Sequence, residues 1–577
     1  MDGMKTKNKT ANQAWRKKPR KFAPKSRLGC KTCKIRRVKC DLSQPSCLKC
    51  LSTGRTCDGY GAMPLACKTE QIEIKPTHNH NESADGDGYD GYLPCTTISA
   101  YEPKQWHSKD RCRISQNLGP LTVLPMTGSI QAEAMSFFED ISIKHLNEYR
   151  PCESWRKTLM LFSQTVPSVR HAATALAMIH RKYLDHHSND RVYEPYFMKD
   201  KLLDKTSLLH YNRAIQLLLK PNSGDSAEIT AVTLLVSYLF TCFDHLVGDD
   251  VQAVKHLRGG VELSRNIDNA TIYDYACHDS QPSGFHAIIG QVTKQIRRLD
   301  MQAGMFLVDW SPANIEEQFT PHLILFDSAF GSLDQAADHL QSLVSQVMWL
   351  RNTEQQTSPM GTVPPLPSSL KGMVLGQLET WSSLFENLLQ RGHRSESAFE
   401  TDRLVSLLRL QHTIARILLS TCHGPGGEMD YDNFLPQFQQ CVALACEVAA
   451  AHQRYAGSSM STFTPEIGII PILYIIGAKC RHHLVRREAL GILRCQLIRE
   501  ASWDSIATAS VVERVIEIEE GAGGEEQMVQ CMEQIPIWER IEALSFIHVP
   551  RGQSAARLDI EYTFCGREGT HIESLVI

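Results

Sequence analysis

The chain has 577 residues, more than one hydrophobic core usually organises, which indicates at least two folding units. Its composition, 42% hydrophobic and 22% charged, is that of an ordinary soluble protein with enough apolar residues for a sizeable core. The net charge of −3, taken as an average, argues against a polyanionic partner.

That average hides a strong polarity of charge. Residues 1–60 contain 17 basic and three acidic residues, a net charge of +14, whereas the other residues contain 44 basic and 61 acidic ones, a net charge of −17. A basic segment on an acidic body is typical of a nucleic-acid reader, because Lys and Arg displace counterions from phosphate. A solvated, disordered basic tail would show the same run of charge.

Residues 1–28 are predicted to form a basic, disordered arm. The run Arg-Lys-Lys-Pro-Arg-Lys at residues 16–21 is long enough for a nuclear-import signal or a phosphate-contacting arm. No apolar segment follows the polar first residues, so no secretory signal is expected. The longest apolar stretch, Ile467 to Ala478, contains Pro471 and is too short to cross a bilayer. We therefore expect a nuclear protein without a membrane segment, whose 19 cysteines are thiols or metal ligands.

Residues 29–60 contain six regularly spaced cysteines, in the pattern Cys-x2-Cys-x6-Cys-x6-Cys-x2-Cys-x6-Cys: Cys30, Cys33, Cys40, Cys47, Cys50 and Cys57. Each Cys-x-x-Cys opening places two thiolates on one side of a tight turn, and a later cysteine closes the site. Six ligands are too few for two separate four-sulfur sites, so two cysteines must bridge two Zn²⁺ ions. Iron–sulfur centres are the rival, but they usually use four cysteines at other spacings.

The small size and the basic neighbours of this segment also fit a zinc cluster. About thirty residues bury too little surface to fold alone, so metal binding should supply the folding free energy. Six thiolates and two Zn²⁺ carry a formal charge of −2, which nearby cations offset: Lys31, Lys34, Arg36, Arg37 and Lys39.

The segment closely resembles the DNA-binding domain of the fungal Zn2Cys6 binuclear-cluster transcription factors. The resemblance implies that Cys30 and Cys47 bridge the two Zn²⁺ ions, and that the other four cysteines complete the two sites. Pro45 resembles the family proline of the central loop. In that family, the basic residues three and four positions after the second cysteine read CGG-type triplets in the major groove, which here implies Arg36 and Arg37.

The chemistry of the basic side chains agrees with that role. A short helix after Cys33 would project Arg36 and Arg37 away from the metals, and an arginine fork can donate two hydrogen bonds to guanine. Four other cations are better candidates for phosphate contacts, which position the module without specifying sequence: Lys34, Lys39, Lys49 and Arg55. The alternative is that some of these cations only neutralise the cluster.

Residues 61–120 are predicted to be a flexible linker, because they are rich in Gly, Asp, Asn and Pro and lack helical periodicity. Many family members carry a coiled coil at this point, but no sustained apolar heptads occur here. A homodimer would therefore form through the helical body, or the protein would bind as a monomer.

Residues 121–577 are predicted to form one large helical regulatory domain, so the chain as a whole is mainly α. Apolar residues recur at helical spacing over several stretches: Val169–Tyr183, Leu208–Leu218, Ile229–Phe243, Leu404–Leu419 and Phe434–Ala451. Near the end, Ala543–Val549 and Ala556–Phe564 are predicted to be short strands of a hairpin. The body weakly resembles the fungal-specific regulatory domain, most closely from Gly468 onward.

The resemblance implies regulation rather than catalysis, with double-stranded DNA and the transcription machinery or a small-molecule effector as partners. Two rival classes are an enzyme with an accessory DNA-binding module and a zinc-stabilised interaction protein. Cys480 with His482 and His483 could suggest a nucleophile and base, but no oxyanion element or orienting acid can be placed, which favours a core thiol and surface histidines. We therefore predict a zinc-dependent DNA-binding regulator of RNA polymerase II transcription that is not an enzyme.

Overall fold

The computed structural model divides into two compact units, Met1–Glu102 and Pro103–Ile577, and each is considered by itself. The structure describes residues 30, 32–33, 40, 47–53, 57, 123–125, 128–189, 203–220, 226–265, 284–305, 307, 310–313, 315, 329–357, 368–392, 398–421, 426–456, 461–495, 497–521, 531–549 and 557–576. The predicted arm (1–28) and linker (61–120) lie outside these residues.

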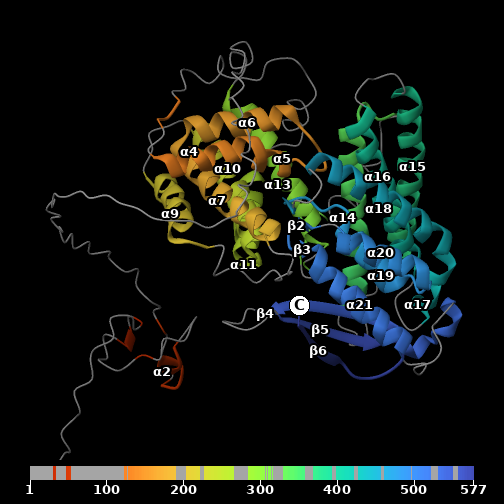
Figure 1. Ribbon diagram of the computed structural model, residues 1–577. Coiled ribbons are helices and arrows are strands. Elements are labelled where there is room, and N and C mark those ends of the chain that lie inside the picture. Colours follow the sequence, from red (N-terminus) through yellow and green to blue (C-terminus); the bar gives the residue numbers. More distant parts are fainter. Residues whose placement is uncertain are drawn as a thin grey trace, which may run out of the picture. The chain divides into compact units, whose positions relative to one another are not determined.

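The first half of the second unit, residues 123–315, is an all-helical N-terminal lobe within the described residues (Figure 1). Its elements are α4 (Ser129–Phe137), the π-helical turn η1 (Phe138–Ser142), α5 (Ile143–His145), α6 (Glu153–Thr165), α7 (Pro167–Asn189), α9 (Lys205–Leu218), α10 (Ser226–Val247), α11 (Asp250–Ser264) and α13 (Phe285–Ala303). The predicted helices are confirmed, and α7 begins at Pro167, because a proline in the first turn sacrifices no helical hydrogen bond.

Helix α10 is the central helix of this lobe. It is the one described helix that is long and apolar enough to cross a membrane by length and composition. However, α10 packs against α7, α11 and α13, and its residues from Leu234 to Val236 and from Tyr238 to Val247 are all buried. Its apolarity is therefore that of a core helix, as the sequence predicted.

Residues 329–521 form the C-terminal lobe, whose helices surround a second core. These helices are α14 (Leu333–Thr357), α15 (Ser368–Gly392), α16 (Ala398–Ser420), α17 (Gly427–Asp430), the 3₁₀ turn η4 (Tyr431–Phe434), α18 (Leu435–Ala456), α19 (Ile470–Lys479), α20 (His483–Cys495) and α21 (Ser505–Gly521). Trp381 of α15 lies at the centre of the packing between α14, α15 and α16: its indole N–H donates to the Ala336 carbonyl, and its ring stacks on Phe385 and His412.

Two small sheets interrupt the helical pattern. One contains β1 (Thr462–Thr464), β2 (Ile498–Glu500) and β3 (Trp503–Asp504), with β1 and β2 parallel. The other is an antiparallel sheet of β4 (Ile541–Val549), β5 (Arg557–Phe564) and β6 (His571–Val576), preceded by the 3₁₀ turns η5 (Met532–Gln534) and η6 (Ile537–Glu539). The predicted hairpin is thus confirmed as β4 and β5, but a third strand extends it, and the description of the rest of the body as all-helical was incomplete.

Three consecutive residues after α5, here called the strap, tie the N-terminal lobe to the C-terminal lobe. Glu148 accepts a hydrogen bond from Arg403 of α16, and the Tyr149 hydroxyl donates to the Glu500 carboxylate of β2 at 2.5 Å. Arg150 donates to Asp338 of α14 at 2.7 Å. The strap therefore reaches three separate elements of the C-terminal lobe.

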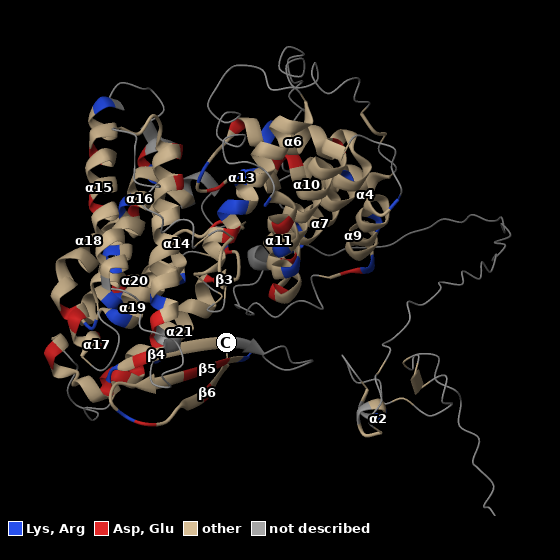
Figure 2. Ribbon diagram, turned by 180° about the vertical axis from the view of Figure 1, so that it is seen from behind, with Lys and Arg blue, Asp and Glu red and all other residues tan. Residues whose placement is uncertain are grey.

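Helices α19, α20 and α21 together contain basic and acidic residues (Figure 2), and buried ion pairs join them. Arg481 and Arg486 are fully buried and share the Glu519 carboxylate of α21, at 3.0 and 2.8 Å. Burial works to raise the pKa of Glu519, but the two guanidinium groups outweigh it and hold that pKa at about 2. The network thus keeps three charged side chains inside the lobe, and the Ile541 N–H of β4 also donates to Glu519.

Candidate metal centre

The two Cys-x-x-Cys segments form matching turns in the first unit. The Cys33 N–H donates to the Cys30 sulfur at 3.3 Å, and the Cys50 N–H donates to the Cys47 sulfur at 3.4 Å. The second turn opens the short helix α2 (Leu48–Leu51). Backbone donors thus stabilise the first sulfur of each half-motif, as the predicted pair of equivalent half-sites requires.

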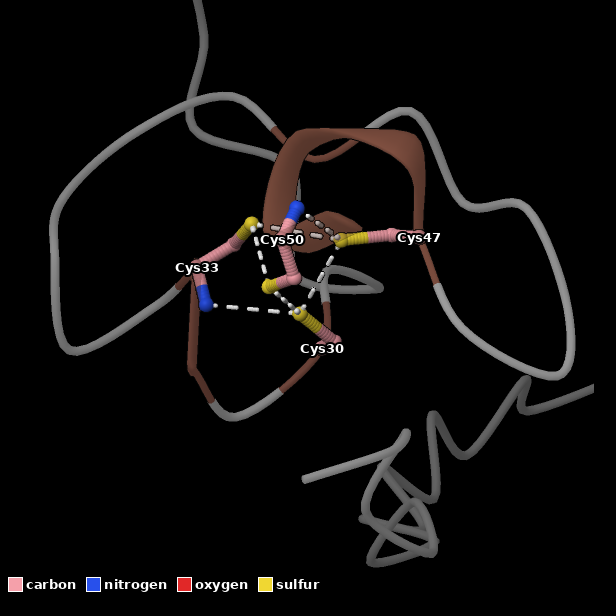
Figure 3. A group of neighbouring side chains, drawn as sticks. All are labelled: Cys30, Cys33, Cys47 and Cys50. Atoms are coloured by element: carbon pink, nitrogen blue, oxygen red, sulfur yellow. Dashed lines mark hydrogen bonds between the residues drawn. The ribbon is translucent and has the colours of Figure 1, made fainter. Parts of the chain in front are cut away.

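The turns bring four sulfurs into one cluster (Figure 3). The sulfurs of Cys30, Cys33, Cys47 and Cys50 all lie within 4.8 Å of one another, and all four residues are fully buried. The Cys30 and Cys33 sulfurs each lie 3.6 Å from that of Cys47. Four sulfurs this close surround a volume suited to tetrahedral thiolate coordination.

The other two cysteines of the motif are Cys40 and Cys57. The Cys30 N–H donates to the Cys40 sulfur at 3.5 Å, and the Cys47 N–H donates to the Cys57 sulfur at the same distance. The two half-motifs therefore repeat the same backbone-to-sulfur pattern. This repeated arrangement of six cysteines fits a binuclear zinc cluster.

Burial of the sulfurs favours uncharged thiols when no metal is bound, so loss of the thiol protons must accompany metal binding. Burial raises the pKa of the Cys30, Cys33 and Cys47 thiols. A buried group of thiolates is costly unless cations offset its charge, and zinc supplies that charge at four-sulfur sites. No disulfide forms among the described cysteines, so all six remain as metal donors.

Of the predicted DNA-contacting residues, Lys49 is described. It lies on α2 and is exposed, and its carbonyl accepts from the Thr53 hydroxyl at 2.9 Å, which caps the end of the helix. The other five lie outside the described residues: Lys34, Arg36, Arg37, Lys39 and Arg55. Lys49 is thus an exposed cation on a short helix that begins directly after the cluster residue Cys47.

The body also contains a chain of polar groups that no sequence pattern indicated. The Glu148 carboxylate lies 2.9 Å from His452 Nδ1, and His452 Nε2 lies 2.6 Å from the Thr462 hydroxyl. Acid, imidazole and hydroxyl follow one another as in an acyl-transfer triad. However, Glu148 and Thr462 are 0% exposed and His452 is 3% exposed, so the hydroxyl has no access to a substrate.

The other candidate nucleophile also lacks the features of an active site. Cys480 is buried, and burial raises its pKa to about 11, which favours the unreactive thiol. His482 and His483 are half-buried, and their rings stack on each other. The predicted core thiol is confirmed, whereas the predicted surface histidines are partly covered. The missed triad has no short sequence signal, because Glu148 lies about 300 residues before His452 and Thr462.

Two family models match the chain. The fungal Zn(2)-Cys(6) binuclear cluster domain matches residues 28–62, which contain all six cysteines, and the fungal specific transcription factor domain matches residues 135–493, which span most of both lobes. The chain belongs to the fungal Zn2Cys6 transcription factors. It is therefore a zinc-cluster, DNA-binding regulator of transcription.

The relatives are regulators too. The chain is 22% identical over 605 aligned residues to the aspercryptin biosynthesis cluster-specific transcription regulator atnN of Emericella nidulans, covering 88% of this chain and 89% of the relative. It is 25% identical to the pestheic acid cluster transcriptional regulator 3 of Pestalotiopsis fici over 48% of this chain and 53% of the relative. The transcriptional regulatory protein moc3 of Schizosaccharomyces pombe is 45% identical over 7% of this chain and 8% of the relative. No solved structure is significantly similar.

Proposed function

We propose that the six cysteines hold two Zn²⁺ ions, with Cys30 and Cys47 as the bridging ligands. The main support is that Cys30 and Cys47 occupy the same first position of the two half-motifs, and that each sulfur accepts an N–H from its own Cys-x-x-Cys turn. A bridging thiolate shares its charge between two metals, and the equivalent positions of Cys30 and Cys47 suit that role. Zinc, when bound, supplies the folding free energy of the module.

The bound module then presents a cationic face to DNA. Arg36 and Arg37 approach base edges in the major groove and read a CGG-type triplet, because each guanidinium group can donate two hydrogen bonds to guanine O6 and N7. Lys34, Lys39, Lys49 and Arg55 contact phosphates, and exposed Lys49 on α2 supports this division of roles. The basic arm at residues 1–28 adds phosphate contacts or a nuclear-import signal, so the protein acts in the nucleus.

The experiment is binding-site selection from random duplexes with the full, zinc-loaded chain. Enrichment of a CGG-type triplet, lost on zinc chelation, is the expected result, and no enrichment with zinc present would refute the proposal. Arg37→Ala should relax the base preference and cost about 1–3 kcal/mol on the selected site. Lys49→Ala should weaken binding to all sequences about equally, and a uniform loss in Arg37→Ala would reassign that arginine to phosphate.

For the body, we propose a non-catalytic regulatory domain covering residues 121–577, joined to the module (29–60) by the linker (61–120). It responds to a small-molecule effector or contacts the transcription machinery, and any homodimer forms through it. The burial of Glu148, His452 and Thr462 supports the absence of catalysis.

Since atnN and the pestheic acid regulator are both named for biosynthetic clusters, we propose that the target genes include a biosynthetic cluster. Transcript profiling after gene deletion tests this, and unchanged biosynthetic genes would contradict it.

A further inference from the structure

Strand β6 is the outer strand of the C-terminal sheet, whose order is β4-β5-β6, and no other described strand pairs with its outer edge (Figure 1). It is paired with β5 from Arg557↔Val576 to Tyr562↔His571 without a register shift. Alternate residues of such a strand direct their N–H and C=O groups to the unpaired side, where they can template another strand. The edge of β6 is therefore regular and available for pairing.

The side chains of β6 alternate between two environments. Leu575 packs against the cluster formed by α21 and β5, and Glu573 on the same side accepts hydrogen bonds from Arg514 at 2.8 Å and Tyr562 at 2.7 Å. Ile572 and Val576 lie on the other face and are 71% and 72% exposed. The strand thus leaves two large aliphatic side chains in water, one on each side of Ser574.

Natural edge strands usually carry a device that prevents pairing, such as an outward lysine, a proline, a bulge or an inward charge. The sequence of β6, His-Ile-Glu-Ser-Leu-Val, contains no lysine or proline, and its pairing with β5 has no bulge. Its one inward charge, Glu573, is already neutralised by Arg514. None of these devices blocks the edge.

The pattern of β6 is complementary to itself. If two copies pair antiparallel about a twofold axis at Ser574, residue 572 of each copy lies opposite residue 576 of the other. Ile572 then packs against Val576 of the second copy on both sides of the axis, and Glu573 lies opposite Leu575 rather than another carboxylate. A closed contact made by the same patch on both subunits is the commonest form of protein oligomer.

We propose that β6 pairs with β6 of a second copy of this chain, so that the two sheets become one six-stranded sheet. The two Ile572–Val576 contacts form an apolar centre. The β5 residues opposite them, Arg557, Asp559 and Glu561, form a polar border, the usual layout of an interface. This dimer goes beyond the proposed DNA reading and requires no coil after the zinc module. A pairing of one short strand buries little area, so the dimer should be reversible and in the micromolar range.

Sedimentation of the full, zinc-loaded chain across the micromolar range provides the first test. The wild type should shift from monomer to dimer, and the double variant Ile572→Lys with Val576→Lys should weaken dimerisation at least about tenfold, because four lysines would meet at the axis. Leu219→Lys is the matched control, since Leu219 is 79% exposed at the end of α9 and should change nothing. A monomeric wild type, or a dimer that the two lysines leave intact, would overturn the proposal.

A crosslink tests the position of the axis. Ser574→Cys would place the two introduced cysteines directly opposite each other, with Cα atoms roughly 4.5–5.5 Å apart, within disulfide range. Mild oxidation should join the two copies through position 574, identified by mass spectrometry, whereas Glu561→Cys on β5 should not crosslink. Joining of 561 but not 574 would refute the register. A monomeric lysine variant should still select the same triplet, so loss of the dimer and loss of DNA reading are distinguishable.

Discussion

Arg403 and Glu148 form an ion pair inside the protein, with 2.6 Å between Arg403 Nη1 and Glu148 Oε1 and with both side chains almost completely buried. Arg403 also donates to the Glu148 carbonyl, and His452 Nδ1 lies 2.9 Å from the same carboxylate oxygen. Burial works to raise the pKa of Glu148, but His452 and Arg403 outweigh it and lower that pKa. The pair therefore remains charged while it holds the strap against α16.

Arg403→Ala should destabilise the body by about 3–5 kcal/mol, because it leaves a buried carboxylate without its cation. Denaturant unfolding of the full chain measures this loss. Arg409→Ala is the control, since Arg409 pairs with Glu386 at 3.0 Å but both side chains are nearly half exposed, and such pairs contribute about 0–1 kcal/mol. Equal losses in the two variants would show that the strap is not held by this pair.

Lower pH should destabilise the N-terminal lobe through two buried histidines. Burial lowers the pKa of His145 to about 4 and that of His180 well below its usual value, and the two rings are hydrogen-bonded at 3.1 Å. Well above pH 6.5 these histidines are neutral in both folded and unfolded chains, so they add no dependence of stability on pH there. As the pH falls from 6.5 toward 4, the two histidines become protonated in the unfolded chain but stay neutral in the folded lobe. The free energy of unfolding therefore decreases.

The measurement is the free energy of unfolding between pH 7 and pH 5. His145→Asn should give a flatter dependence on pH than the wild type, whatever its effect at pH 7. A variant at exposed His571 of β6 should keep the wild-type slope. An unchanged slope in His145→Asn would contradict the assignment.

Two glycine substitutions should have opposite effects. A Cβ at Gly468 would overlap the ring of Tyr149, which cannot move away because Glu500 holds its hydroxyl. Gly468→Ala should therefore cost about 1–3 kcal/mol through overpacking. Gly491 lies within α20 with no atom within 4 Å of an added Cβ, so Gly491→Ala should stabilise by about 0.5–1 kcal/mol. Thermal unfolding of both variants shows whether each substitution lowers or raises the stability. An unchanged stability in Gly468→Ala would mean that the strap can shift.

Cys47→Ser should reduce the bound zinc below two ions per chain and abolish sequence-specific DNA binding, because a bridging sulfur serves both metals. Metal content by mass spectrometry and binding to the selected duplex measure the two effects. Cys446→Ser is the control, because Cys446 is exposed on α18 and should leave both unchanged. Retention of two tightly bound zinc ions in Cys47→Ser would contradict the bridge.

The features predictable from sequence were those encoded within short segments. The six cysteines identified the metal centre because ligand spacing is local, and the buried face of α10 was evident from its own apolar residues. Likewise, the apolar spacing from Val169 to Tyr183 marked α7. Each of these signals depends on residues that are neighbours along the chain, and each was confirmed by the structure or by the family match.

The features that were missed depend on residues far apart in sequence. Glu148 and Thr462 share His452 across more than 300 residues, and no local pattern distinguishes this glutamate from a solvated one. Strands β1 to β3 have only two or three residues each, too few to show an alternation. The pattern of β6 has one charged residue on its packed side, and a neutralising Arg514 on another element cannot be foreseen.

The strap also fixes the number of residues that the chain can have at this point. Glu148, Tyr149 and Arg150 are adjacent, yet each fits a different site in the other lobe. Inserting one residue between α5 and Glu148 would place the Glu148 carboxylate against the Glu500 carboxylate, and deleting one there would place the Tyr149 phenol against Arg403. Changes in length should therefore be far less tolerated here than single substitutions, and random insertion libraries of this gene should show a gap at these codons.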